Sequence, residues 1–139
     1  MQSVLKMAEK VTKYSVLEFT EYPGPRYQTQ GTHSGEEFFQ EVLKPLFEKL
    51  LLEEKKDPEN DYFLEVNLDS TAGYASSFLD EAFGNLAYEF SQEVVIPRLR
   101  IISNEEPDWV SVIKNETVAE WEQKRVNGIP RKPHFEKRK

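Results

Sequence analysis

A predicted strand, a turn of small residues and a predicted helix follow one another over residues 62–91, and this stretch constrains the fold most. Apolar residues alternate over residues 62–68, which is typical of a buried strand. After the turn, apolar residues recur at positions 79, 82, 83, 86, 87 and 90, which places them on one face of a helix. Ser76 and Ser77 lie where that helix begins, and the first backbone N–H groups of a helix have no partner within it. The two serines could therefore cap the helix, hold an anion or accept a phosphate.

The segments before this stretch predict a hairpin and a helix. A strand is expected over residues 14–20, and residues 26–30 could return beside it after the Pro- and Gly-containing turn. Ser34 and Glu37 have the spacing of a capping box, and they precede a helix that we expect to end near residue 56. Pro45 lies inside that helix, so a kink or a break is expected there.

The segments after it predict one more strand and one more helix. Residues 94–103 have a strand pattern, and Pro107 suits the first turn of a last helix in which Trp109 is a buried position. This alternation predicts an α/β fold, bordering on α+β, in which helices cover a mixed sheet. Right-handed crossovers would place the serine turn at the carboxyl edge of the central strand.

The chain divides into three parts at this level of description. Residues 1–13 fit either a short helix or a frayed strand, residues 14–126 form the domain, and residues 127–139 form a basic tail that we expect to be mobile.

Charge is distributed unevenly along the chain. The net charge is −7, but residues 122–139 contain seven Lys or Arg against two Glu, which leaves about −12 on the rest. An acidic body argues against nucleic-acid binding outside the tail. The chain has no cysteine and no run of roughly 20 apolar residues, so we expect a cytoplasmic protein without disulfides and without a membrane span.

Three groups of residues resemble one known family. They are Gly24-Pro25-Arg26-Tyr27, Gly31-Thr32-His33-Ser34-Gly35-Glu36-Glu37-Phe38 and Ala75-Ser76-Ser77-Phe78-Leu79-Asp80-Glu81-Ala82-Phe83-Gly84. Together they resemble the STAS-like bacterial domains of unknown function over roughly residues 15–118, and the third group is the most specific. The resemblance to STAS domains, the fold of sulfate transporters and anti-sigma-factor antagonists, implies a small mixed sheet of about four strands with helices packed mainly on one face.

The resemblance also implies a regulatory role for the serine turn. In anti-sigma-factor antagonists, a serine at the start of the helix after the central strand is phosphorylated by a partner kinase with an ATPase-type fold. By position this serine corresponds to Ser76 or Ser77, and Ser77 is the better match. The neighbours differ from the antagonist pattern, because Ala75 stands where those proteins have an acid and Phe78 stands where they have glycine.

The carboxylates near the turn have a structural and a chemical interpretation. Ser77 and Asp80 have the spacing of a helix cap. Asp80 and Glu81 are expected to face water in the first turn of the helix, where the helix dipole favours acids. Together with Asp69 they could instead form paired carboxylates for acid–base chemistry, which we consider the weaker interpretation.

The remaining polar residues do not predict a site. His33 and His134 lie far apart in irregular segments, so neither a metal nor a cofactor is predicted. Arg26, Arg98 and Arg100 could form a basic patch, but we expect ordinary pairing with nearby glutamates.

The sequence therefore predicts a non-enzymatic regulatory module that binds a partner protein, with an ATPase-fold kinase or an anti-sigma-like regulator as the expected partner. The residues expected to contact it are Ser76, Ser77, Phe78, Asp80, Glu81 and Gly84. Two alternatives stay open: an assembly subunit without a phosphorylation switch, and a nucleic-acid-associated regulator that uses residues 131–139.

Overall fold

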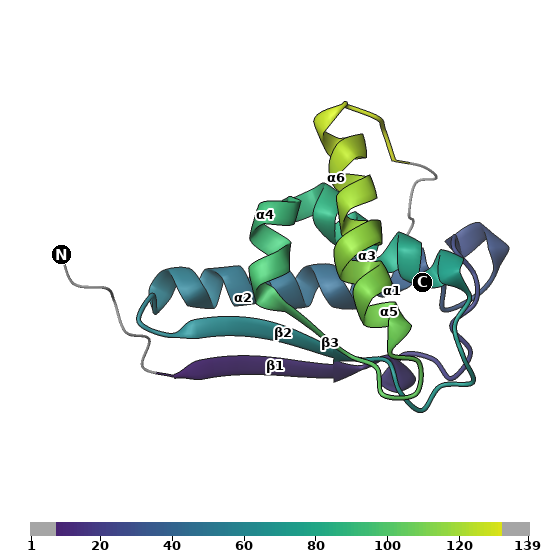
Figure 1. The fold of residues 1–139 in the computed structure, drawn as a ribbon, viewed down its shortest axis with the longest axis horizontal. Coiled ribbons are helices and arrows are strands. Elements are labelled where there is room, and N and C mark those ends of the chain that lie inside the picture. Colours follow the sequence, from purple (N-terminus) through teal and green to yellow (C-terminus); the bar gives the residue numbers. More distant parts are fainter. Residues whose placement is uncertain (1–7, 132–139) are drawn as a thin grey trace.

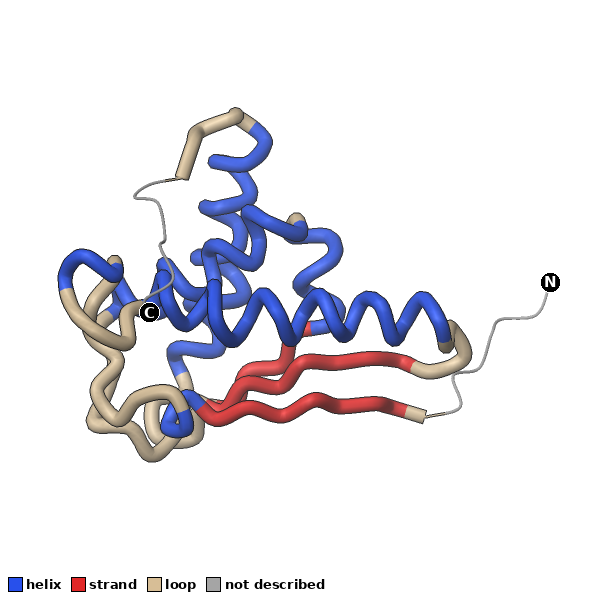
Figure 2. Tube along the Cα trace, turned by 180° about the vertical axis from the view of Figure 1, so that it is seen from behind, coloured by secondary structure: helices blue, strands red, loops and turns tan. Residues whose placement is uncertain are grey.

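Three parallel strands form a sheet in the order β1-β2-β3. They are β1 (Glu9–Ser15), β2 (Asp61–Asn67) and β3 (Leu99–Ile102). The computed structural model describes residues 8–131 of the chain. Because each strand is added on the same side of the one before it, right-handed crossovers place all the connecting helices on one face of the sheet. Figures 1 and 2 show this arrangement from two opposite sides, with the helices above the sheet and its other face uncovered.

The helices fall into three groups, one after each strand. The first contains α1 (Gly35–Phe38), a π-helical turn (Phe39–Leu43) and α2 (Lys44–Lys56); the second contains α3 (Ser76–Phe90), α4 (Gln92–Val95) and a 3-10 turn (Ile96–Arg98); the third contains α5 (Asp108–Ser111), a π-helical turn (Val112–Thr117) and α6 (Val118–Val126). Between residues 8 and 131, no helix has the length and apolar character needed to cross a membrane.

The prediction of a mixed sheet of about four strands is wrong, because all three strands of the described residues run parallel. The strand expected over residues 14–20 instead occupies Glu9–Ser15, and a 3-10 turn (Val16–Glu18) follows it. The expected return strand at 26–30 contains another 3-10 turn (Gln28–Gln30), so no hairpin forms there. The last strand is shorter than predicted, because α4 and the 3-10 turn that holds Pro97 occupy its first half.

The first strand was missed because it lies at the edge of the sheet. Tyr14 packs against the core from its inner face, whereas Lys10 and Lys13 remain exposed. Lysines protect an exposed strand edge from pairing with another chain, but they weaken the alternation that identifies a strand. The domain therefore includes residues that were assigned to the N-terminal segment.

The capping box at the start of the first helix is confirmed. The Ser34 hydroxyl accepts a hydrogen bond from the backbone N–H of Glu37 at 3.0 Å, and the Glu37 carboxylate accepts one from the Ser34 backbone N–H at 3.2 Å. Pro45, which has no N–H to donate, does not break the helix. The π-helical turn Phe39–Leu43 precedes it and widens the backbone, which relieves the clash expected with the carbonyl of Glu41.

The core lies between the sheet and the helices. Leu64 and Val66 of β2 and Leu99 of β3 point into it and are at most 1% exposed. On the uncovered face of the sheet, the Arg100 guanidinium lies 3.7 Å from the centre of the Phe63 ring and forms a 2.9 Å ion pair with Glu9.

Candidate functional site

The serine turn lies at the carboxyl edge of the central strand, as the order of elements predicted. In Figure 1 the loops that follow the three strands gather at this end of the sheet. Backbone hydrogen bonds fix the turn to the loop after β1, from Ala72 to the Glu21 carbonyl at 2.8 Å and from Ala75 to the Pro23 carbonyl at 3.1 Å. Neighbouring loops, rather than the turn alone, therefore fix the start of α3.

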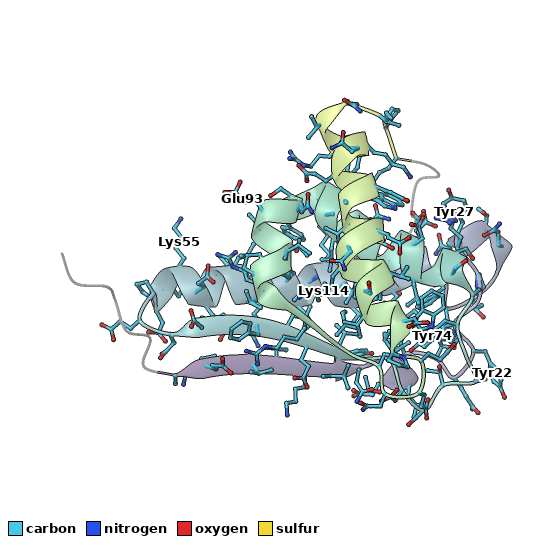
Figure 3. The ribbon with its side chains drawn as sticks, in the orientation of Figure 1. Tyr22, Tyr27, Lys55, Tyr74, Glu93 and Lys114 are labelled. Atoms are coloured by element: carbon cyan, nitrogen blue, oxygen red, sulfur yellow. The ribbon has the colours of Figure 1, made fainter. Side chains whose placement is uncertain are left out.

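Tyr74 anchors the turn from within. Its hydroxyl donates a 2.6 Å hydrogen bond to the carbonyl of Leu68, and its ring packs against Phe78 with the centroids 6.2 Å apart. Burial raises the pKa of Tyr74, so this hydroxyl stays protonated and continues to donate. Figure 3 shows Tyr74 and Tyr27 projecting from the two loops that meet at this end of the domain.

The first turn of α3 has no side-chain cap. Ala75 occupies the cap position, so the predicted capping arrangement of Ser77 with Asp80 is wrong. Ser77 is half-buried, and its hydroxyl donates a 3.4 Å hydrogen bond to the Gly24 carbonyl. Ser76 is exposed at the first helical position. Of the two candidate phosphoacceptors, the structure therefore presents Ser76 to solvent and turns Ser77 toward the loop after β1.

Three of the residues expected to contact a partner lie inside the domain. Phe78 is fully buried among aromatic rings, and its centroid lies 5.7 Å from that of Phe38. Gly84 is buried against Trp121, and Glu81 is only 3% exposed. Because other elements pack against α3 on several sides, positions of α3 that the sequence suggests are exposed are buried in the structure. The predicted contact surface is reduced to Ser76, to Asp80 and to the accessible part of Ser77.

Arg26 connects the loop after β1 to the acids of α3. One guanidinium nitrogen lies 2.7 Å from Asp80 and 3.2 Å from Glu81. The other oxygen of Asp80 accepts from the Trp121 indole N–H at 3.1 Å, and Glu81 accepts from the Asn85 side chain at 2.8 Å. Burial raises the pKa of Glu81, while the hydrogen bonds from Asn85 and Arg26 oppose that rise. Asp80 and Glu81 are thus structural ion-pair partners of Arg26, and the expectation that Glu81 faces water is wrong.

The other polar candidates also have structural partners. Asp69 accepts hydrogen bonds from the backbone N–H groups of Asn104 and Glu105, which lowers its pKa and holds the loop after β3. Arg98 pairs with Glu54 at 2.9 Å. Arg26, Arg98 and Arg100 each pair with an acid, which confirms ordinary pairing over a basic patch.

Neither histidine is placed as a metal ligand in the part of the chain that the structure describes. His33 packs edge-on against Phe19, with the ring centroids 5.1 Å apart, and His134 lies outside the described residues. No group of three or more His, Cys, Asp or Glu side chains within residues 8–131 could hold a metal ion.

A cleft of about 310 Å³ lies beside Ser76, and we call it the serine cleft. It separates the first turn of α3 from the helical segment 108–126. Its lining consists of Arg26, Ser76, Leu79, Asp80, Trp109, Val112, Glu116, Thr117 and Glu120. The π-helical turn Val112–Thr117 forms part of its wall. Irregular helical turns of this kind are frequent at functional sites.

The sequence identified one wall of this cleft and missed the other. Trp109 was expected to be a buried position; it packs against the core but is only partly buried, and its indole N–H has no hydrogen-bond partner among the described residues. Glu116 and Glu120 are exposed on the same side of the helical segment. Their spacing of four residues, which places both carboxylates on one face of a helix, was the available signal.

The contact between α3 and α6 gives a direct test of this packing. A Cβ atom on Gly84 would lie 2.2 Å from the Trp121 ring, so Gly84→Ala must displace the indole that also bonds Asp80. The strain of overpacking exceeds the gain in helix propensity, and we expect the free energy of unfolding to fall by about 1–2 kcal/mol. Urea unfolding measures the loss. In a Trp121→Ala background the ring is absent, so an equal loss there would contradict this contact.

Comparison with known proteins identifies the domain. The family model described as STAS-like domain of unknown function (DUF4325) matches residues 34–109, which run from the start of the first helix to Trp109 and include the whole of α3. No curated protein and no solved structure shows significant similarity to the chain. The matched residues are more than half of the 139 residues, so the chain belongs to the family of STAS-like domains of unknown function.

Proposed function

We propose that this STAS-like domain is a non-enzymatic regulatory module that binds a partner protein at the serine cleft. One observation carries the proposal: Ser76 is exposed at the uncapped start of α3 and borders a cleft of about 310 Å³. Helix N-termini present free N–H groups and a partial positive charge to whatever approaches them. The acids of the turn have structural partners, so the cleft offers a shaped surface rather than an acid–base pair.

Photo-crosslinking tests the docking face. A photoreactive amino acid at position 76 should give crosslinked complexes when the full chain is expressed in its native cells. The matched control is position 48, because Glu48 is exposed on α2, away from the cleft. Absence of crosslinks from position 76, or the same crosslinks from position 48, would rule out this face.

We further propose Ser76 as the residue that a partner kinase modifies. Ser76 is the more accessible of the two serines, whereas the Ser77 hydroxyl already bonds to the Gly24 carbonyl. A phosphate adds about −1.5 to −2 charge, which the helix N-terminus favours. Asp80, Glu116 and Glu120 line the same cleft, so the added charge would strongly change which partner binds.

Intact-mass measurement tests the modification site. After co-expression with candidate ATPase-fold kinases, the wild-type chain should gain the mass of one phosphate. We expect Ser76→Ala to abolish the gain and Ser77→Ala to retain it. The opposite result would return the assignment to Ser77, which the family resemblance favours.

The assembly alternative has one observation in its favour. β1 forms the edge of the sheet and pairs with β2 on one side only, so another chain could add beside it. A photoreactive residue at Lys13 would report such a contact. For the nucleic-acid alternative, only Arg131 of the basic segment is described, and it bonds to Asn85 at 3.0 Å and Glu89 at 2.8 Å.

A further inference from the structure

The serine cleft shares two lining residues with a second cleft. This second cleft has a volume of about 470 Å³ and is lined by Glu105, Glu106, Pro107, Asp108, Trp109 and Val112. The shared residues are Trp109 and Val112, which give the two clefts a common apolar lining. We call the two clefts together the acidic groove. It runs from the loop after β3, across the start of the helical segment 108–126, to the first turn of α3.

Carboxylates line both clefts of this groove. They are Glu105, Glu106 and Asp108 in the second cleft and Asp80, Glu116 and Glu120 in the serine cleft. Among the described residues, Glu106, Asp108, Glu116 and Glu120 are exposed and have no ion-pair partner. Arg26 is the lining cation, and Asp80 and Glu81 already occupy it. The groove therefore presents uncompensated negative charge around an apolar lining.

Trp109 gives the groove a second, independent feature. Its Nε1 atom is buried yet has no hydrogen-bond partner within the described residues, although tryptophan N–H groups usually find an acceptor when buried. The rest of the side chain is partly exposed between the two clefts. An indole ring flanked by carboxylates is a favourable place for a guanidinium or an ammonium group.

We propose that the acidic groove binds a basic segment of the partner protein, in which Lys or Arg side chains flank an apolar residue. The apolar residue packs on Trp109 and Val112, one cation lies over the Trp109 ring, and others pair with Glu116, Glu120 and Asp108. The inference rests on the proposed function, because it specifies the chemistry of the partner at the same face. Phosphate-rich ligands are disfavoured, because the carboxylates of the groove would repel them.

A random peptide library displayed on phage, selected on the full-length chain, is the probe. We expect the enriched peptides to share Lys or Arg next to an apolar residue. One synthetic enriched peptide is then titrated against the wild-type chain and three variants. Glu116→Gln with Glu120→Gln should weaken its binding by about fivefold, and Trp109→Ala by a similar factor. Glu41→Gln with Glu48→Gln, two exposed acids elsewhere on the first helical segment, should leave it unchanged. Added salt should weaken the wild-type complex.

Three results would overturn the inference: no enriched peptide, enriched peptides without basic residues, or equal weakening by the control pair. Crosslinking separates this failure from failure of the proposed function. If the crosslinks from position 76 persist unchanged in the chain that carries Glu116→Gln and Glu120→Gln, the docking face stands and the basic partner does not. If position 76 gives no crosslinks at all, the proposed function itself fails.

Discussion

Replacing Gly35 by alanine is expected to lower the free energy of unfolding by about 3 kcal/mol. Gly35 is the first residue of α1, and a Cβ atom there would lie 2.3 Å from the carbonyl oxygen of Phe78 in α3. The added Cβ is fixed to the backbone of Gly35 and its neighbour is the backbone carbonyl of Phe78, so no side-chain rotation can relieve the contact. The two helices must separate, which opens the aromatic core around Phe78. Urea unfolding followed by circular dichroism measures the loss.

The matched control is Gly24→Ala. Gly24 also lies next to the serine turn, but the nearest atom to a Cβ added there would be the Tyr22 carbonyl oxygen at 4.0 Å, which is ordinary contact. We expect this variant to stay within about 0.5 kcal/mol of wild type, as surface substitutions usually do. If Gly35→Ala were as mild as Gly24→Ala, the close approach of α1 to α3 would not describe the folded protein.

The sequence predicted the parts of the fold whose signal is local. The capping box at Ser34 identified the start of a helix, because its two hydrogen bonds join residues three positions apart. The alternation over residues 62–68 identified the central strand, because that strand is buried on its inner face. The edge strand β1 was misplaced, because lysines replace apolar residues along it.

The interior of α3 shows why the site was harder to predict. Periodicity predicted one apolar face, yet Glu81, Gly84 and Asn85 are buried as well. Their partners lie far along the chain: Arg26 reaches Glu81 across 55 residues, and Trp121 covers Gly84. No local pattern encodes such contacts. Surface positions in the first turn, such as Ser76, could be predicted because the helix start alone defines them.

The family match covers one wall of the serine cleft more completely than the other. The matched residues 34–109 contain Ser76, Asp80 and Trp109, whereas Glu116 and Glu120 follow the matched region. The first turn of α3 thus belongs to the domain that defines the family, and part of the opposite wall of the serine cleft does not.

Replacing Arg26 by methionine is expected to cost about 3 kcal/mol near neutral pH, because it leaves Glu81 buried without its cation. Burial already raises the pKa of Glu81, and the loss of Arg26 raises it further. With a raised pKa, the folded chain holds a proton on Glu81 at a pH at which the unfolded chain has released it. The stabilisation that this proton gives is complete below the ordinary pKa of glutamate and is lost as the pH rises through the raised value.

The cost of Arg26→Met should therefore shrink as the pH falls, because a protonated Glu81 needs no cation. Urea unfolding of both proteins between about pH 7.5 and about pH 5 measures the difference. Glu81→Gln supplies the control, since it removes the charge and keeps an oxygen for the Asn85 side chain. In the Glu81→Gln background, the loss of unfolding free energy caused by Arg26→Met should be smaller and should depend little on pH. Part of the loss should remain, because Asp80 still loses its ion-pair partner. A cost that is the same at both pH values and in both backgrounds would mean that Arg26 holds the loop through Asp80 alone.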